Sequence, residues 1–320
     1  MTVCIAALFR WPYGKNDIGT AVVTASDRMI TAGDVEYEPA QLKIGFLSRR
    51  VLILIAGDYT VHSHAIKEVQ YQVRSNQAVK PYDVACMYGT AIQSSRRRQA
   101  EDLILAPLGL NTDSFLAQQR DMSEGLISSL TTQMQDFQGP DVEALVVGME
   151  NDVAHIYIVD RHGTVGCYDD VGFAAIGIGA WHARSRLMQN GYVNTVGFAP
   201  ALAAIYAAKK SSEVAPGVGK ATDMHLMFRG GSEPLWPATA QKLSDLYIDF
   251  EKQQTALAAS AIADLAKFIE DPKNGPKTLK EAAHESTNTQ KSDSVTVQDE
   301  VEEDFTGSDI DGNGDSEAER

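Results

Sequence analysis

Strand-like and helix-like segments are segregated along this chain, and their order constrains the fold more than any other feature. Two pairs of β-branched and aliphatic runs come first, a block with helical spacing follows, then further strands and a second helical block. Separate runs of strands and helices predict an α+β fold and argue against βαβ winding. Two antiparallel sheets packed face to face, each covered by helices, accommodate this order economically. We therefore expect a four-layer αββα sandwich.

The first strands are predicted to form two β-hairpins. Val3–Phe9 and Gly19–Ser26 pair across a long loop at Arg10–Ile18, which contains Trp-Pro-Tyr-Gly and Asn-Asp. Leu42–Leu47 and Val51–Ala56 form the second hairpin through a short turn. The alternation of strands stops after this hairpin.

Helical spacing and strand-length apolar runs then divide the rest of the chain. Helices are predicted at His62–Asn76, Asp83–Leu103, Thr112–Gln138, Ala180–Gln189, Pro200–Lys210 and Ala238–Glu270. Strands are predicted at Glu143–Val147, His155–Val159, Phe173–Ile178 and Met224–Phe228. Pro81 is suited to the start of the second helix, because proline is tolerated in the first helical turn.

The composition changes at about Asp271. Residues 271–320 are rich in small and polar residues and hold 14 Asp/Glu against 5 Lys/Arg, which is −9 of the chain's net charge of −15. Such a segment cannot bury enough apolar surface to offset its ordering entropy. We therefore predict one folded domain at residues 1–270 and a disordered acidic tail at 271–320. The negative charge gives no footprint for nucleic acid.

The cysteines and the apolar runs indicate the compartment. Cys4, Cys86 and Cys167 are too scattered for a disulfide framework, which suits a reducing cytosol. The apolar start of the chain lacks a preceding basic residue and a small-residue cleavage site, so it is typical of a strand and not of a signal peptide. No run approaches the roughly 20 residues that span a membrane. We expect a cytoplasmic protein without membrane contact.

The sequence offers no good metal site. There is no CxxC motif and no Cys/His cluster of the kind that binds zinc. His62 and His64 flank Ser63 at the start of a predicted helix, and without a third ligand they are expected to be surface residues. Cys4 is expected to be a buried strand residue and not a nucleophile. No metal and no cofactor is predicted.

Thr2 is a candidate nucleophile because it follows Met1 and is small enough to permit removal of the methionine. A threonine at the start of a chain supplies both a hydroxyl and a free α-amine. The amine has a pKa of about 7.7–8.0, so it can accept the hydroxyl proton near neutral pH. Many proteins begin with Met-Thr, so this feature alone is weak evidence.

Residues farther along the chain resemble a known family. Asp27 lies in Ala-Ser-Asp-Arg-Met-Ile-Thr-Ala-Gly, Thr31 follows it by four residues, Lys43 follows it by sixteen, and Gly57 follows Lys43 by fourteen. These types at these intervals are similar to the active site of proteasome β subunits and their bacterial HslV relatives. The resemblance extends more loosely to about Phe228. It implies an N-terminal-nucleophile (Ntn) hydrolase, a threonine-type peptidase or amidase.

The resemblance also implies a role for each residue. Lys43 places a positive charge beside Thr2 and favours the alkoxide, and Asp27 pairs with Lys43 and fixes its position. The N–H of Gly57 points at the developing oxyanion; removal of one such donor typically slows turnover about 100- to 1000-fold. Thr31 binds an extended peptide by strand addition.

Further residues complete the predicted substrate site. The resemblance implies that Ile30, Ile55 and Tyr59 line a pocket beside Thr31, and these side chains favour an apolar residue before the scissile bond. Thr2 and Asp27 lie 25 residues apart, more than in the family, and the extra residues are expected in the loop of the first hairpin.

Two departures from the family pattern concern the groups that support the threonine amine. The family usually has Gly-Ser-Gly where this chain has Gly177-Ile178-Gly179, and it has an Asp where this chain has Ser212 followed by Glu213. Ser212 and Glu213 are therefore the candidate supporting residues.

Three functions stay open. The first is a peptidase acting on peptides or proteins inside a homo-oligomeric ring, as the resemblance implies. The others are an Ntn amidase acting on small molecules and a non-catalytic scaffold subunit of such a ring.

Overall fold

The computed structural model describes residues 2–14, 17–32, 35–38, 43–74 and 80–270. It divides into two compact units, Met1–Asp249 and Phe250–Arg320. Within the described residues, the first unit is a mixed α+β structure built on two five-stranded antiparallel sheets, so the predicted α+β class is confirmed. The predicted acidic tail at 271–320 lies outside the described residues.

The first sheet contains the N-terminal hairpin at its centre. Its order is β10-β1-β2-β11-β12, and neighbouring strands are antiparallel. The bounds are β1 Cys4–Pro12, β2 Ile18–Ser26, β10 Phe173–Ile176, β11 Asp223–Phe228 and β12 Gly231–Pro234. Segments far apart in sequence therefore meet on either side of the hairpin.

The second sheet has the order β5-β6-β7-β8-β9, again antiparallel. Its strands are β5 Ile44–Ser48, β6 Val51–Gly57, β7 Val142–Glu150, β8 Val153–Val159 and β9 Val165–Cys167. A separate ribbon pairs β3 (Ile30–Ala32) with β4 (Val35–Tyr37).

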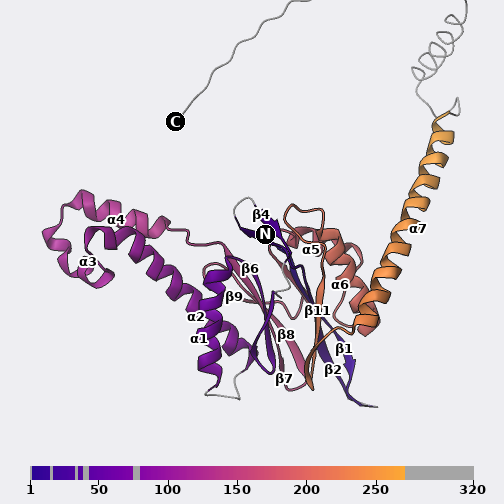
Figure 1. Cartoon of the computed structure of the whole chain (residues 1–320), viewed down its shortest axis with the longest axis horizontal. Coiled ribbons are helices and arrows are strands. Elements are labelled where there is room, and N and C mark those ends of the chain that lie inside the picture. Colours follow the sequence, from indigo (N-terminus) through magenta and orange to yellow (C-terminus); the bar gives the residue numbers. More distant parts are fainter. Residues whose placement is uncertain (1, 15–16, 33–34, 39–42, 75–79, 271–320) are drawn as a thin grey trace, which may run out of the picture. The chain divides into compact units, whose positions relative to one another are not determined.

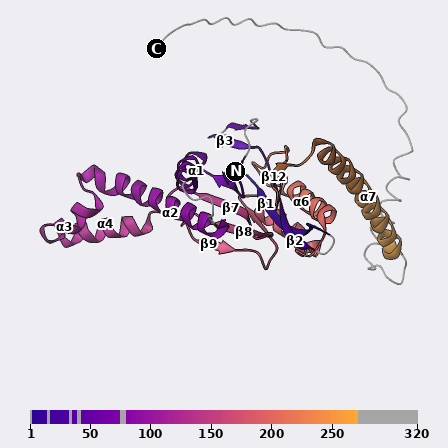
Figure 2. The same ribbon diagram turned by 90° about the horizontal axis from the view of Figure 1, so that it is seen from below.

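Helices cover the outer faces of the two sheets. The α-helices are α1 Tyr59–Arg74, α2 Pro81–Ala100, α3 Thr112–Gln118, α4 Glu124–Asp136, α5 Ala180–Gln189, α6 Phe198–Ser212 and α7 Pro237–Glu270. In Figure 1, α1 and α2 lie beside the β5–β9 sheet and α5 and α6 beside the other sheet; Figure 2 shows the two sheets between these helix pairs from below. No helix among the described residues combines the length and the apolar character needed to cross a bilayer.

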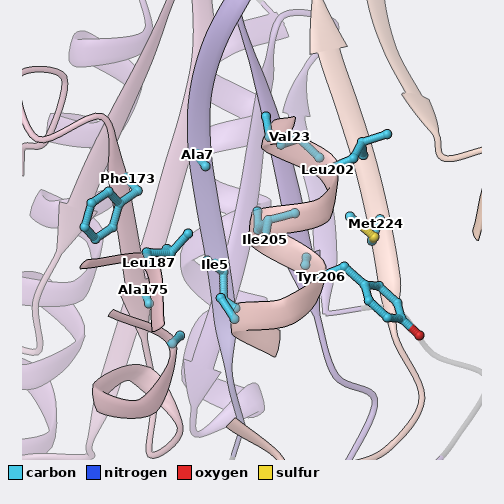
Figure 3. Packing of buried hydrophobic residues seen from close by; sticks show 14 of the residues in the cluster. Ile5, Ala7, Val23, Phe173, Ala175, Leu187, Leu202, Ile205, Tyr206 and Met224 are labelled. Atoms are coloured by element: carbon cyan, nitrogen blue, oxygen red, sulfur yellow. The ribbon is translucent and has the colours of Figure 1, made fainter. Parts of the chain in front are cut away.

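Alternation along the strands explains why both faces of each sheet are buried. In β1, Cys4 and Leu8 lie in the cluster between the two sheets, whereas Ile5 and Phe9 pack against α5 and α6. Figure 3 shows this outer core, with Ile205 of α6 over β1. A third cluster packs the opposite face of the β5–β9 sheet against α1 and α2.

The first hairpin is longer than predicted. The strands pair as far as Arg10↔Thr20, Trp11↔Gly19 and Pro12↔Ile18, so most of the expected loop at Arg10–Ile18 is strand. Trp11 explains the extension, because its ring contacts Phe198 at 5.2 Å and Phe228 at 5.9 Å between centroids. Proline at a hairpin end removes no required ladder donor.

The predicted helix Thr112–Gln138 is also different. It is divided into α3 and α4 by a short 3₁₀ turn, because the Ser123 side chain caps α4 by accepting from the N–H of Leu126 at 3.4 Å. The other predicted helices and strands are present with altered ends. Leu105, Phe115 and Leu130 give the α3–α4 region a small core of its own.

Helix α7 passes from the first unit into the second at Asp249. In the first unit, Tyr247 makes an edge contact with Tyr206 of α6 at 5.7 Å between ring centroids. In the second unit, the helix continues from Phe250 to Glu270 and its described side chains are exposed.

Candidate active site

The fold brings Thr2, Asp27 and Lys43 to one end of the two sheets. Thr2 lies just before β1 and Asp27 just after β2, and the pairing of Cys4 with Ser26 places these ends together. Lys43 lies just before β5, on the second sheet. The site therefore lies where the two sheets meet, and each of its residues adjoins the end of a β-strand.

Hydrogen bonds join the three side chains directly. Thr2 Oγ1 donates to Asp27 Oδ1, and Lys43 Nζ donates to Thr2 Oγ1 at 2.5 Å. Lys43 Nζ also lies 3.0 Å and 3.1 Å from the two carboxylate oxygens of Asp27. The hydroxyl of Thr2 thus lies between a cation and a carboxylate, and the Lys43 cation is placed where it can stabilise an alkoxide.

Backbone amides hold the Asp27 carboxylate in place. The side chain is fully buried, and it accepts from the N–H groups of Val3 at 2.9 Å, Met29 at 2.9 Å and Gly219 at 3.0 Å. A buried charge is costly unless it is paired and hydrogen-bonded. These three N–H groups and Lys43 provide its hydrogen-bond partners and fix the position of the carboxylate.

The segment Gly177–Gly179 positions the backbone of Thr2. The N–H of Gly179 donates to the Thr2 carbonyl at 3.3 Å. Gly177 has φ +84°, and a Cβ atom there would lie 2.5 Å from the same carbonyl oxygen. The N–H of Gly177 is itself held by Glu143 Oε2 at 3.0 Å. Both glycines therefore act through backbone atoms, and the family's serine position is occupied by Ile178, which is 46% exposed.

Gly57 ends β6, two residues after Ile55. The Cys4 thiol, near Thr2, donates to the carbonyl of Ile55 at 3.4 Å, and the Ile55 N–H donates to the carbonyl of Lys43 at 3.3 Å. Burial raises the pKa of Cys4 to about 12, so its thiolate is disfavoured near neutral pH. Cys4 is therefore a buried strand residue, as expected.

The predicted substrate residues have different environments. Ile30 and Thr31 lie in β3, and Thr31 pairs with Glu36 of β4. Ile55 is buried among the side chains between the second sheet and helices α1 and α2. Tyr59 begins α1 and is 45% exposed. Ile55 is thus enclosed by other side chains, whereas Tyr59 is partly open to solvent.

The two predicted supporting residues make contacts elsewhere. Ser212 is buried and its hydroxyl donates to the carbonyl of Ala208 at 2.8 Å, within α6. Glu213 accepts from Lys209 at 2.6 Å and from Lys210 at 2.8 Å. Among the described residues, no hydrogen bond joins Ser212 or Glu213 to Thr2.

Lys209 is a residue that the sequence reasoning missed. It is fully buried, and its Nζ donates to the carbonyls of Gly219 at 2.8 Å and Lys220 at 2.9 Å. Because the N–H of Gly219 donates to Asp27, Lys209 supports the loop that holds the carboxylate. Its burial could have been inferred from its position four residues after Ile205, which places both residues on the same buried face of α6.

The described residues contain no cluster of three or more His, Cys, Asp or Glu side chains that could bind a metal ion.

No protein-family model matches the chain, and no curated protein is significantly similar to it.

Proposed function

We propose that this protein is an N-terminal threonine hydrolase that cleaves amide bonds, similar to proteasome β subunits. One observation carries the proposal: the Thr2 hydroxyl lies between Lys43 Nζ and the Asp27 carboxylate. Thr2 is the nucleophile in this reaction, Lys43 favours its deprotonated form, and Asp27 positions Lys43. The described residues offer no comparable arrangement around Cys4, whose thiol is used in a backbone contact.

The reaction proceeds by acyl transfer. The Thr2 hydroxyl adds to the carbonyl carbon of the substrate, and its proton passes to the free α-amine of Thr2. The tetrahedral intermediate carries its negative charge on the former carbonyl oxygen, which the Gly57 N–H stabilises. The Thr2 ammonium returns this proton to the substrate nitrogen, the C–N bond breaks and the amine leaves. Water then adds to the ester on Thr2, the carboxylic acid is released and the Thr2 hydroxyl is restored. The mechanism requires Thr2 to be the first residue of the mature chain.

The packing of helices and sheets supports the finer description of the fold. The apolar clusters run from α5 and α6 through the first sheet, between the sheets, and on to α1 and α2. We propose that this is the four-layer αββα sandwich of Ntn hydrolases. The same resemblance suggests a homo-oligomeric ring in the cytoplasm that acts on peptides or proteins.

The test combines intact mass with a covalent probe. The purified protein should lack Met1, and an epoxyketone peptide should form a ring adduct with the hydroxyl and amine of Thr2. Peptide mapping should locate the added mass on the N-terminal peptide. Thr2→Ala should abolish labelling, whereas Thr2→Ser should retain some, since the serine keeps both groups. Active protein that retains Met1 completely would rule out the mechanism.

Two alternatives give other results. The scaffold alternative is favoured by Ser212, because its hydroxyl is bonded within α6 and no described contact replaces the family's support of the amine. In that case protein with Thr2 exposed would neither be labelled nor hydrolyse a broad panel of peptides and amides. An Ntn amidase for small molecules would instead hydrolyse acyl-amides and leave peptides intact.

A further inference from the structure

His62 is a buried histidine beside the strand that ends at Gly57. It lies in α1 and is fully buried, so the expectation that it is a surface residue is wrong. Its Nε2 lies 2.9 Å from the carbonyl oxygen of Ala56, and its Nδ1 is hydrogen-bonded to the hydroxyl of Tyr88 in α2. The two rings are stacked with an interplanar angle of 9°. Both ring nitrogens are thus used inside the protein.

These partners determine where the imidazole carries its proton. The carbonyl of Ala56 can only accept, so Nε2 carries the hydrogen and donates it. Nδ1 of the neutral ring then accepts from the Tyr88 hydroxyl. Burial lowers the pKa of His62, which keeps the ring neutral near physiological pH. The direction of donation therefore runs from Tyr88 to His62 and on to Ala56.

The carbonyl of Ala56 belongs to the same peptide unit as the N–H of Gly57. In a trans peptide these two groups point in opposite directions. In β6, the N–H of Ile55 donates to the carbonyl of Lys43, which precedes the neighbouring strand β5. Just after β6, the N–H of Asp58 donates to the carbonyl of Asp141, which precedes the other neighbour, β7. By this alternation the Gly57 N–H is directed to the side of Lys43, away from β7.

Gly57 has a conformation that fits this role. Its φ is +101°, and a Cβ atom would lie 2.0 Å from the carbonyl oxygen of Asp141. The peptide is therefore held by a glycine that other residues cannot replace and, on its carbonyl, by His62. A hydrogen bond to the carbonyl of an amide also makes its N–H a stronger donor.

We propose that His62, supported by Tyr88, is a positioning residue that fixes and polarises the Ala56–Gly57 peptide so that the Gly57 N–H can stabilise an oxyanion. This inference rests on the proposed function, and it identifies His62 as the residue that orients the Gly57 N–H, the oxyanion donor of that function. His62 itself does not touch the substrate. A histidine that only filled the core would affect stability and leave the Gly57 amide and the transition state unchanged.

Two substitutions separate these roles because each retains one of the two ring contacts. In His62→Asn the side-chain amide reaches the position of Nδ1 and keeps a partner for Tyr88, but loses the donor to Ala56. In His62→Gln the amide reaches the position of Nε2 and can still donate to Ala56. His64→Asn is the matched control, since His64 is exposed on the same helix.

Kinetics of the mature protein with a fluorogenic peptide amide form the first arm. His62→Asn should lower kcat by about tenfold with little change in KM, less than the roughly 100-fold loss on removing an oxyanion donor outright. His62→Gln should restore most of kcat, and His64→Asn should match the wild type. Circular dichroism and the thermal midpoint establish which variants are folded.

Selective isotope labelling gives a second readout that does not depend on activity. The chain has two Ala–Gly pairs, Ala32–Gly33 and Ala56–Gly57. Labelling alanine carbonyls with ¹³C and glycine amides with ¹⁵N therefore restricts a carbonyl–amide correlation spectrum to two signals, and Ala32→Ser identifies one of them. The carbonyl of Ala56 and the amide nitrogen of Gly57 should both move upfield in His62→Asn and stay near the wild-type positions in His62→Gln.

The outcomes distinguish the two levels of the proposal. Unchanged Ala56 and Gly57 signals in folded His62→Asn, or an unchanged kcat in an active protein, would overturn the positioning role. If the wild type hydrolyses nothing, the proposed function fails, and the spectrum still decides whether His62 sets the peptide. If His62→Asn does not fold, Tyr88→Phe replaces it, and smaller changes in the same direction are expected because the Nε2–H form is then less favoured.

Discussion

Lys209 Nζ lies 2.8 Å from the carbonyl oxygen of Gly219, and the N–H of the same glycine donates to Asp27. A lysine buried in helix α6 is thereby connected to the carboxylate at the candidate active site through one loop residue. Burial lowers the pKa of Lys209, and the ion pair with Glu213 opposes this shift. The cost of burying the ammonium group is offset by its three acceptors, the carbonyls of Gly219 and Lys220 and the Glu213 carboxylate.

We predict that Lys209→Met lowers both stability and turnover. Loss of the donor leaves two loop carbonyls without their partner, and a lost buried hydrogen-bond partner costs about 1–3 kcal/mol. The loop should then hold Asp27 less firmly. Lys210→Met is the control, because Lys210 contacts the same Glu213 but is more exposed, and such ion pairs contribute about 0–1 kcal/mol. Urea unfolding and kcat measure the two effects; equal losses in both variants would contradict the assigned role.

We predict that Lys43→Ala nearly abolishes turnover and leaves the fold intact. The substitution removes the cation 2.5 Å from Thr2 Oγ1, and loss of one preorganised electrostatic partner typically lowers kcat about 100- to 1000-fold. Asp27→Asn should lower turnover as well, by loosening Lys43. Steady-state kinetics with a check by circular dichroism tests both. Full activity in folded Lys43→Ala would mean that another group assists Thr2.

The hydrogen-bonded group at the site could be anticipated because its residues lie at fixed spacings on strands and turns. The resemblance to proteasome β subunits, carried by the spacings of Asp27, Lys43 and Gly57, placed Thr2, Asp27 and Lys43 in one site, and hydrogen bonds join these three side chains. Lys209 and Gly219 could not be placed in the same way. The contact between Gly219 and Asp27 joins residues 192 positions apart, so it depends on how α6 packs on the first sheet.

The main differences between the predicted and the observed fold also arise from contacts between distant parts of the chain. Arg10–Pro12 was predicted as loop from its turn residues, yet Trp11 packs on Phe198 and Phe228, and this distant contact extends the strand. The burial of His62 likewise depends on Tyr88 of another helix. Local patterns predict an element and its buried face, whereas its ends and its polar partners are decided by tertiary packing.

We predict that part of the protein's stability is lost as pH falls below about 6.5 because of His62. The pKa of His62 is lowered in the folded protein, chiefly by burial. Below its unfolded value of 6.5, the unfolded chain binds a proton that folded His62 does not accept, so unfolding becomes more favourable. Its contribution is full above pH 6.5 and decreases as the pH falls toward the folded pKa.

The measurement compares wild type with His62→Gln by urea unfolding at about pH 7.5 and about pH 5.5. The difference in free energy of unfolding between the two proteins should shift in favour of the variant at the lower pH. The comparison cancels the contribution of His155 to the pH dependence, because this residue is present in both proteins. The pKa of His155 is raised, mainly by its hydrogen bond with Asp169, so its contribution to stability changes with pH in the opposite direction. A difference independent of pH would show that His62 is protonated equally in both states.

We predict that Gly177→Ala damages the active site more than its backbone strain alone explains. Gly177 has φ +84°, and a Cβ atom would lie 2.5 Å from the Thr2 carbonyl oxygen and 3.0 Å from Thr2 Cγ2.

Gly191 has φ +60° with no atom within 4 Å of its Cβ position, so Gly191→Ala carries the strain without the collision. A left-handed conformation costs a non-glycine residue about 1–2 kcal/mol. Gly191→Ala should therefore lose about that stability and keep its kcat. Gly177→Ala should lose more stability and most of its turnover, because Thr2 is displaced from Lys43 and Asp27. Unfolding curves and kcat for the two variants test this, and equal kcat values would mean that Thr2 tolerates the displacement or that its position does not limit the reaction.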